Sequence, residues 1–525
     1  MIKVICSGSR AQASDIVAAA MGRSCSASQV AAATIQDMVA SKGKGNPGCW
    51  VVVDPLESWT QAIVETLSEG PCKVIVFGAL PASLAQFLGA RCEVLSSDVV
   101  EAAGCAPAPS RQFSQSAAAV HYEAQLGGRS SPIPVRPFAR YDFTDEWNNL
   151  GYGAITADGS IWSLAQMVSV PAANVLANVC VNGVSVSGYA ALWDIGRGSV
   201  LWFNRSVGPV DSQEWSLVEH FIANYRAVEL PCWPVVREVP YGYDAAVTMR
   251  LDCDEDVESA RALWQSYRDL GVPFSLALHA KVLADPVHHV LPREVLANGG
   301  AILSHTATHA PNWGGSYEAA YHEGAESAAS ILAAVGHSVR YAVSPFHQTP
   351  DYARAGLADA GYAGCIGGII RNDPDFLVAR SGQIPGTGQG FITHSQQCML
   401  HGDCVLDGAD SLAVFKQAFE QAMAGGAFFG YLDHPFSPRY QYGWDTEEQR
   451  IAFHKEFVAH IRRQGKVLMC NESDAMDFLT YKSSVKVAGQ PKGFLVSKGW
   501  GNALWPIAVE YQGRQIALDG DEVAL

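Results

Sequence analysis

The stretch AAVTMRLDCDED, residues 245–256, joins an apolar run to a cluster of acidic residues. A short run of small and β-branched apolar residues is typical of a strand that is buried on both faces. The acidic residues begin where this strand should end, which is where parallel α/β folds carry their functional side chains. The stretch therefore predicts both a parallel sheet and a polar site at one edge of it.

Strand-like and helix-like segments alternate downstream of this stretch. The strand-like segments include VPFSLALH (272–279), GAILSH (300–305), VRYAVSPF (339–346) and FFGYLDHPF (428–436), and helical patterns that often end in glycine separate them. Repeated strand–helix units favour a (β/α) barrel or a distorted version of one. We expect this barrel to span residues 239–482, with its chemistry at the carboxyl ends of the strands.

The residues before the barrel follow a different α/β pattern. Short apolar strands such as MIKVICSG (1–8), CWVVVDP (49–55) and KVIVFGA (73–79) alternate with Ala-rich helices. This order predicts a flavodoxin-like α/β domain over residues 1–238, with an irregular connection at 106–148 that is rich in Pro, Ser and Arg. Residues 483–525 predict a small β appendage, so we expect an α/β chain of three parts.

Composition narrows the class of protein. The chain has 525 residues, a net charge of −16, 48% hydrophobic residues and 13 cysteines at irregular spacings. The acidic balance disfavours nucleic acid as a partner, and no apolar run is long enough to span a membrane. Scattered cysteines within apolar strands indicate buried thiols, and the first residues fit a strand better than a signal peptide. We therefore expect a cytoplasmic protein.

Three strand ends supply side chains suited to metal chemistry. Asp252 and Asp254 follow the first strand, His305 and His309 follow GAILSH, and His434 follows FFGYLD. Two imidazoles and one carboxylate with open positions suit a catalytic divalent cation. A second carboxylate and a further histidine can then act as base and acid. The alternatives are that the aspartates cap a helix and that the histidines belong to turns or to the core.

These residues resemble the motifs of the polysaccharide deacetylase family, of the NodB-homology or carbohydrate esterase 4 type, over roughly residues 240–480. RLDCDED matches an Asp-x-Asp variant of the first motif, SHTATH the His-x-x-x-His motif, and Leu-Asp-His the late Leu-x-His motif. The resemblance implies that Asp252 is the general base and His434 the acid. It also implies that Asp254, His305 and His309 hold the metal.

The family's third motif, Arg-x-Pro-Tyr, is incomplete in this sequence. VSPF (343–346) keeps the proline but lacks the arginine that holds the catalytic aspartate in the family. Arg250, Arg340 and Arg371 are the candidates to replace it. The resemblance also implies that the backbone N–H of Phe346 helps to bind an oxyanion, and we place no fourth motif.

Aromatic residues near the predicted site are candidates for substrate binding. Phe346, Trp313, Tyr440 and Trp444, together with Tyr442, follow active-site strands and could stack on sugar rings, although loop packing explains them equally well. Asp433 alternates to the other face of its strand, so we assign it no role.

A second cluster of possible ligands lies in HSQQCMLHGDC, residues 394–404. Its four side chains, those of His394, Cys398, His401 and Cys404, could hold a structural zinc ion. The spacing differs from the regular zinc-site patterns, so thiols in a loop beside the active site are the favoured interpretation.

The first domain carries a second, looser resemblance. GRGSVLWFNRSVGP (196–209) and the helix-like segment after it resemble the end of class I glutamine-amidotransferase-like domains. The Gly-x-Cys-x-Gly nucleophile elbow of those domains is missing, since the best candidate strand end reads VFGALPAS (76–83). We therefore expect a non-catalytic scaffold or ligand-binding module.

The sequence as a whole predicts a hydrolase that uses a divalent metal, Zn²⁺ in the first place and otherwise Co²⁺, Ni²⁺, Mn²⁺ or Fe²⁺. The expected reaction removes the N-acetyl group of an amino sugar or saccharide. Two alternatives remain open, namely hydrolysis of a non-sugar amide or cyclic ureide at the same site, and a catalytically inactive carbohydrate-binding protein. The sequence specifies neither the sugar nor the oligomeric state.

Overall fold

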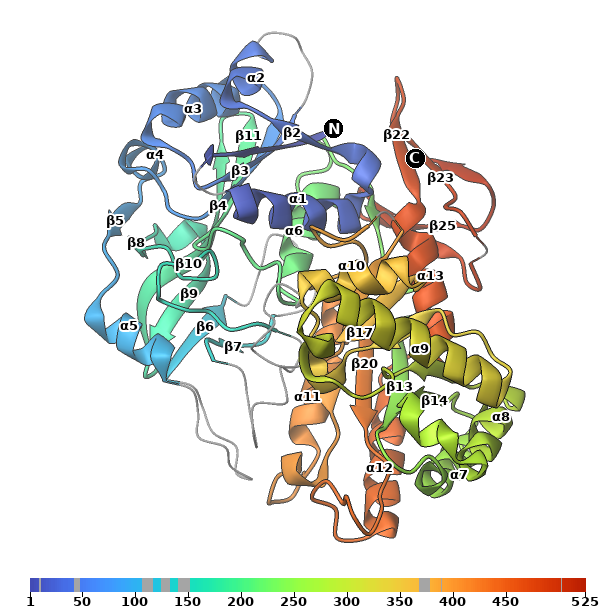
Figure 1. Ribbon diagram of the computed structural model, residues 1–525. Coiled ribbons are helices and arrows are strands. Elements are labelled where there is room, and N and C mark those ends of the chain that lie inside the picture. Colours follow the sequence, from blue (N-terminus) through green and yellow to red (C-terminus); the bar gives the residue numbers. More distant parts are fainter. Residues whose placement is uncertain are drawn as a thin grey trace.

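The computed structural model describes residues 1–8, 11–41, 48–105, 117–123, 133–139, 152–367, 378–388, 390–501 and 503–525. Two large sheets organise these residues. Figure 1 shows the N-terminal sheet (blue to teal) on one side and the barrel (green to orange) on the other. Much of the predicted irregular connection at 106–148 lies outside the described residues, as does Arg371.

The N-terminal sheet has nine strands in the order β2-β1-β3-β4-β11-β10-β9-β6-β7. Its first five strands are parallel and have the 2-1-3-4-5 order of flavodoxin-like folds, as the sequence predicted. They are β1 (Ile2–Cys6), β2 (Val30–Ala33), β3 (Cys49–Val53), β4 (Cys72–Phe77) and β11 (Gly198–Phe203).

An antiparallel extension widens this sheet beyond the predicted fold. It consists of β10 (Val184–Ile195), β9 (Val175–Val181), β6 (Ala118–Tyr122) and β7 (Arg136–Pro137). A separate pair is formed by β5 (Arg91–Glu93) and β8 (Met167–Ser169). The helices of this half are α1 (Ala11–Cys25), α2 (Ile35–Ala40), α3 (Thr60–Glu69), α4 (Ala82–Phe87), α5 (Ser97–Gly104) and α6 (Trp215–Ala223).

The second large sheet is the predicted distorted barrel. Its order is β18-β17-β16-β15-β14-β13-β20-β19, with β21 paired to β13, and its strand pairs are parallel. The bounds are β13 (Ala245–Cys253), β14 (Ser275–Leu278), β15 (Ala301–Ser304), β16 (Tyr341–Val343), β17 (Gly364–Gly367), β18 (Ile392–Ser395), β19 (Cys398–Met399), β20 (Phe428–Asp433) and β21 (Val467–Cys470).

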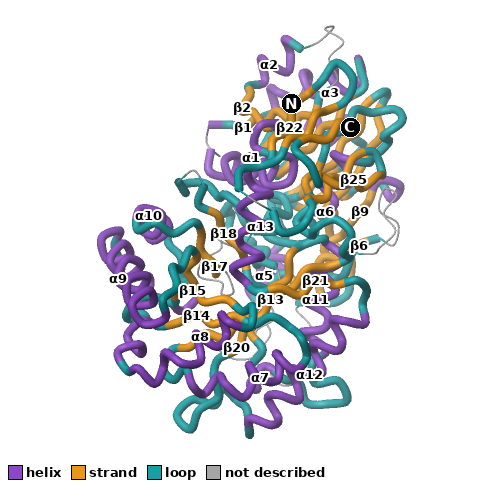
Figure 2. Tube along the Cα trace, turned by 90° about the vertical axis from the view of Figure 1, so that its right-hand side faces the viewer, coloured by secondary structure: helices purple, strands orange, loops and turns teal. Residues whose placement is uncertain are grey.

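Helices surround this sheet, as Figure 2 shows for α7, α8, α9 and α12. The helices are α7 (Arg261–Asp269), α8 (Val290–Ala297), α9 (Tyr317–Val335), α10 (Asp351–Asp359), α11 (Ala413–Gly425), α12 (Glu447–Arg463) and α13 (Glu472–Ser484). The long helix α9 shows how local sequence sets its ends. The side chain of Ser316 accepts a hydrogen bond from the N–H of Ala319 at one end, and Gly336 takes a left-handed φ of 77° at the other.

The alternation of β13 orients the functional side chains. Val247, Met249 and Leu251 pack into the core beneath the helices. Because side chains alternate between the two faces of a strand, Arg250 and Asp252 point to the opposite face. Asp252 and Asp254 do not cap the short helical turn Glu258–Ala260 that follows the strand. Asp256 does so instead, because its Oδ1 accepts from the N–H groups of Glu258 and Ser259.

The C-terminal residues form two small sheets rather than one appendage. One contains β22 (Lys486–Gly489), β23 (Phe494–Ser497) and β26 (Glu522–Ala524). The other joins β24 (Ile507–Tyr511) and β25 (Arg514–Leu518) to β12 (Val235–Val236), which lies just before the barrel in sequence. The two chain ends lie near each other at the end of the molecule opposite α12 (Figures 1 and 2).

A buried ion pair ties the two halves together. Arg380 donates from Nε and Nη2 to the two carboxylate oxygens of Glu219 on α6, at 2.9 and 2.7 Å. The hydroxyl of Ser24 donates to the same carboxylate, and both charged side chains are almost fully buried. Among the described residues, no helix combines the length and apolar character that a membrane crossing requires.

This ion pair yields a prediction about stability. Arg380→Met should leave Glu219 buried without its counter-charge and destabilise the fold by roughly 3–5 kcal/mol. Thermal unfolding followed by circular dichroism should show a clearly lower midpoint. Lys498→Met removes one partner of an exposed ion pair with Asp521 and serves as the control, with an unchanged midpoint. Equal midpoints for both variants would show that the pair does not hold the halves together.

Candidate metal centre

A cavity of about 510 Å³ lies at the carboxyl ends of the barrel strands. Residues from β13, β14, β15, β16 and β20, or from the loops directly after them, form much of its wall. The imidazoles that line it belong to His279, His305, His309, His347, His401 and His434. The strand ends named by the sequence thus meet in one place.

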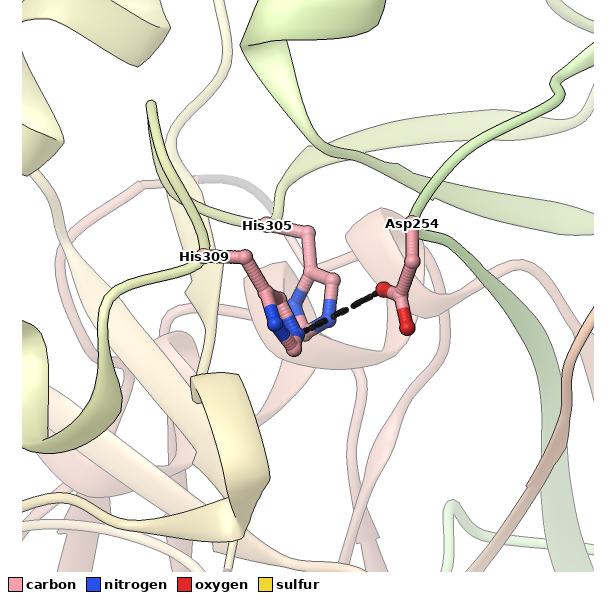
Figure 3. Close-up of side chains that lie close together, drawn as sticks. All are labelled: Asp254, His305 and His309. Atoms are coloured by element: carbon pink, nitrogen blue, oxygen red, sulfur yellow. Dashed lines mark hydrogen bonds and ion pairs between the residues drawn. The ribbon is translucent and has the colours of Figure 1, made fainter.

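Asp254, His305 and His309 face one another within this cavity (Figure 3). The Nε2 atoms of the two histidines are 3.1 Å apart, and they lie 3.1 and 3.5 Å from Oδ1 of Asp254. Ligand atoms about 2.1 Å from a tetrahedral metal ion are about 3.4 Å from one another. The three observed separations therefore fit one ion between these atoms.

The hydrogen bonding of Asp254 agrees with this fit. Its Oδ1 atom is buried and has no hydrogen bond of regular geometry within the described residues, although an imidazole nitrogen lies close by. Buried carboxylate oxygens are normally satisfied by donors or by a cation. The donor set of two imidazoles and one carboxylate suits zinc and similar divalent ions.

Groups behind the three side chains fix their orientation. His305 lies within 3.2 Å, through Nδ1, of the carbonyl oxygen of Val343. Since a carbonyl can only accept, Nδ1 carries a proton, and in the neutral ring Nε2 is the atom available to a metal ion. Asp252 and Asp254 raise the pKa of His305 against the effect of burial, so a metal ion would compete with a proton for Nε2. The loop from 305 to 309 is held by Glu323 of α9, whose Oε2 accepts from the N–H groups of Ala307 and Thr308, each at 2.9 Å.

The protonation of His309 also suits ligation. Burial, and then the neighbouring His305, lower the pKa of His309 to about 4. The ring is therefore uncharged near neutral pH, as a metal-ligating imidazole must be.

Asp252 is held by an arginine from its own strand. Nε and Nη2 of Arg250 donate to the two oxygens of Asp252 at 2.5 and 3.3 Å, and Nη1 donates to both oxygens of Glu472. Burial raises the pKa of Asp252, but the charge and hydrogen bond of Arg250 together with the charges of His305 and His434 lower it to about 2. Of the three candidate arginines, Arg250 thus takes this place, whereas Arg340 pairs with Asp477 at the surface.

His434 lies on the opposite side of Asp254. Its Nε2 is 3.7 Å from Oδ2 of Asp254, and its ring stacks on Tyr442 with centroids 4.3 Å apart. Its Nδ1 shares a 2.8 Å hydrogen bond with Nε2 of His401. Burial, and then the nearby His434, lower the pKa of His401 to about 3, so His401 is an uncharged partner.

Asp433 faces away from the cavity, as the strand alternation predicted, but its carboxylate organises this side of the site. Oδ2 lies 3.2 Å from Nη1 of Arg450 and 3.0 Å from Nε2 of His454, both on α12. Oδ1 accepts from the backbone N–H of His434 at 2.7 Å. Asp433 therefore positions the main chain that carries His434.

Two of the predicted substrate-binding residues lie elsewhere. Trp313 is fully buried among α9, α10 and β17 residues, and Trp444 is buried in the core below α12, so neither indole can stack on a ligand in the cavity. Phe346, Tyr440 and Tyr442 do line the cavity. The large apolar rings of the two tryptophans gain more from core packing than from exposure.

The second cluster of possible ligands does not converge on a zinc site, which agrees with its favoured interpretation as loop residues. His394 pairs with the hydroxyl of Ser381, His401 pairs with His434, and Cys398 and Cys404 form no disulfide. Within the described residues, the groups able to hold a cation are Asp254 with His305 and His309, and His401 with Asp433 and His434. Asp433 already accepts from Arg450, His454 and a backbone N–H, so the second group has little capacity left for a cation.

Sequence reasoning missed several residues of the site. His279 and His347 line the cavity, and Glu323 and Glu472 support it. His279 comes directly after the strand segment VPFSLAL, so its position at a strand end was a usable signal. Glu323 and Glu472 lie within helices, and residue spacing alone does not show that their side chains face the site.

The backbone around the cavity is strained. His309, Phe346, His347 and Tyr442 have φ values of 56°, 50°, 55° and 48°. Non-glycine residues rarely adopt such conformations, and they gather at functional sites where the surroundings enforce them. The strain therefore agrees with a site that fixes the direction of these side chains.

Comparisons with known proteins bear on the fold alone. No protein-family profile and no curated protein match the sequence. A protein from Mycobacterium smegmatis assigned as a polysaccharide deacetylase is 16% identical, with 45% of this chain and 91% of that one covered at a TM-score of 0.35. A family 4 carbohydrate esterase from Streptomyces lividans is 14% identical, with 44% and 93% covered at a TM-score of 0.29.

An allantoinase is also similar, at 13% identity, with 46% of this chain and 91% of that one covered and a TM-score of 0.36. Two of these three solved structures are thus described by the names of the family that the sequence motifs resemble. At these identities and scores the comparisons say nothing about chemistry, which rests on the geometry described above.

The support by Glu323 yields a prediction about metal affinity. Glu323→Ala frees two backbone N–H groups in the loop that carries His305 and His309, so it should weaken metal binding by about 10-fold. Competition with a chromophoric chelator measures this affinity. Glu326→Ala, at an exposed position of the same helix, is the matched control and should bind metal as the unchanged protein does. An unaltered affinity of Glu323→Ala would contradict the role given to this carboxylate.

Proposed function

We propose that this protein is a metal-dependent deacetylase that hydrolyses the N-acetyl group of an amino sugar or saccharide. The observation that carries the proposal is the convergence of Oδ1 of Asp254 with the Nε2 atoms of His305 and His309, at 3.1–3.5 Å, in a cavity that also contains Asp252 and His434. The proposed metal ligands, general base and general acid thus line the same cavity.

Asp254, His305 and His309 would hold the ion, with zinc as the first choice for this donor set. When bound, such an ion lowers the pKa of a water molecule and polarises the carbonyl group of the substrate. The cavity volume of about 510 Å³ is in the ordinary range for a small-molecule site.

Asp252 acts as the general base. Arg250, His305 and His434 lower its pKa to about 2 against the effect of burial, so the carboxylate is ionised near neutral pH, as a base must be. Arg250 and Glu472 fix its direction, so the base is oriented before the substrate arrives. The carboxylate of Glu472 pairs with Arg250 and so balances part of the arginine's positive charge in the buried site.

His434 acts as the general acid. An amide nitrogen is a poor leaving group unless it is protonated, and an imidazole near the carbonyl carbon can supply that proton. Stacking on Tyr442 and the hydrogen bond to His401 hold the His434 ring in place. Asp433 holds its backbone, so His434 is oriented from three sides.

Aromatic side chains supply the binding surface. The rings of Phe346 and His309 have centroids 4.5 Å apart, and Tyr440 stacks on Tyr442 at 5.9 Å. Phe346 and Tyr440 are partly exposed, which suits contact with the apolar face of a sugar ring. We therefore place the substrate between the rings of Phe346 and Tyr440, next to the proposed metal ligands Asp254, His305 and His309.

The proposal is tested by acetate release from a panel of acetamido sugars. The metal-loaded protein should release acetate, and removal of the metal with a chelator should abolish the activity until Zn²⁺ is restored. Asp252→Asn should keep its metal and lose roughly 10²–10⁴-fold in kcat, because the base is removed without changing the ligands. Asp269→Asn, at an exposed helix end, is the matched control and should keep full activity.

Other outcomes separate the alternative functions. Release of product from cyclic ureides or non-sugar amides, with none from acetamido sugars, would replace the proposed substrate class. Saccharide binding without turnover in the metal-loaded protein would favour a catalytically inactive binding protein. Equal activity of Asp252→Asn and the unchanged protein would contradict the mechanism.

A further inference from the structure

His279 is a cavity residue to which the proposed mechanism gives no task. It follows β14 directly, so it stands at the same edge of the barrel as Asp254 and His305. The residue is only 9% exposed, and its ring centroid lies 5.9 Å from that of His309. Its position is therefore that of a functional residue, beside the proposed ligands.

One ring nitrogen of His279 is already engaged. Nδ1 lies 2.8 Å from the backbone carbonyl oxygen of Asp254. A carbonyl oxygen can only accept, so Nδ1 carries a proton. In the neutral ring, Nε2 then has a lone pair and acts as an acceptor.

The other nitrogen is unused. Nε2 of His279 is buried and has no hydrogen-bond partner within the part of the chain that the structure describes. Buried polar atoms without a partner are rare and unfavourable, and at a cavity wall they indicate a ligand atom that completes the bond.

Metal ligation does not explain why Nε2 of His279 lacks a hydrogen-bond partner among the described residues. The donor atoms of Asp254, His305 and His309 form a group within 4.8 Å of one another, and His279 is not part of it. The hydrogen bond from Nδ1 to the main chain of Asp254 also fixes the ring, so that Nε2 cannot swing toward the ion without losing it. Nε2 thus lies beside the proposed metal site.

We propose that Nε2 of His279 recognises the substrate by accepting a hydrogen bond from a hydroxyl group near the scissile acetamido group. This inference rests on the proposed function and narrows its substrate class. The substrate is then a sugar with a free hydroxyl group close to the amide. Analogues in which that hydroxyl is removed or methylated are processed with a lower kcat/KM.

A double-mutant cycle between protein and substrate tests the inference. His279→Phe and the unchanged protein are assayed, both metal-loaded, with the best acetamido sugar from the acetate-release panel and with its mono-deoxy analogues. One analogue should lose roughly 3- to 10-fold in kcat/KM with the unchanged protein, the value typical of one hydrogen bond. With His279→Phe the same analogue and the parent sugar should be processed equally well.

Two further variants separate recognition from a structural effect. His289→Phe is the matched control, because this histidine also bonds a backbone carbonyl, that of Leu283, but does not line the cavity. It should show the discrimination of the unchanged protein. His279→Gln offers a side-chain oxygen as acceptor and should recover part of the discrimination that His279→Phe loses.

The possible failures are distinguishable. Normal activity with the same analogue discrimination in His279→Phe would overturn this inference alone. A fall in the metal content of His279→Phe, measured by elemental analysis, would overturn it by making His279 a ligand. Failure of the unchanged protein to bind or cleave any acetamido sugar would remove the proposed function and this inference with it.

Discussion

Three electron-rich atoms are held against one another at the rim of the barrel, and the rest of the site is arranged around them. Oδ1 of Asp254 and the Nε2 atoms of His305 and His309 lie 3.1–3.5 Å apart in a largely buried position. Lone pairs at such distances repel unless a proton or a cation lies between them. Burial lowers the pKa of His309 to about 4, so His309 supplies no proton near neutral pH, whereas Asp252 and Asp254 raise the pKa of His305 against the effect of burial. A proton on His305 or a cation therefore balances these lone pairs.

Rigid elements enforce this convergence. Val343 of β16 orients His305, Glu323 of α9 holds the loop to His309, and β13 carries Asp254. These supports come from separate strands and helices, so the three atoms stay together even though His309 has a strained φ of 56°. The cost of this strain is offset by the packed barrel beneath it.

The position of Arg250 explains why the third motif can lack its arginine. Arg250 stands two residues before Asp252 on the same strand, and the two-residue alternation of β13 places both on one face. The base is therefore held from within its own strand, with Glu472 of α13 behind it. An arginine on another strand is not needed for this purpose.

Much of this arrangement could be predicted from the sequence. The parallel strands followed from their apolar runs, and the meeting of Asp254, His305 and His309 followed from the rule that strand ends share one edge. Glu323, Glu472 and His401 could not be found in this way, because their roles depend on which helix or loop packs against the site.

The candidates that the structure places outside the site have physical explanations too. The positions of Trp313 and Trp444 after active-site strands suggest ligand binding, but large rings beside a core gain more from burial. The cluster at 394–404 was rich in soft ligands, but β18 and β19 send His394 and His401 to different partners. Spacing along the chain does not give the direction of side chains after a strand leaves the sheet.

The central claim is that one divalent cation lies between Asp254, His305 and His309. The most direct measurement is an anomalous difference map from crystals grown with stoichiometric Zn²⁺, recorded on both sides of the zinc absorption edge. The account predicts one strong peak about 2.0–2.2 Å from Oδ1 of Asp254 and from the two Nε2 atoms. A map with no peak there, or with its peak only beside His401, would contradict it.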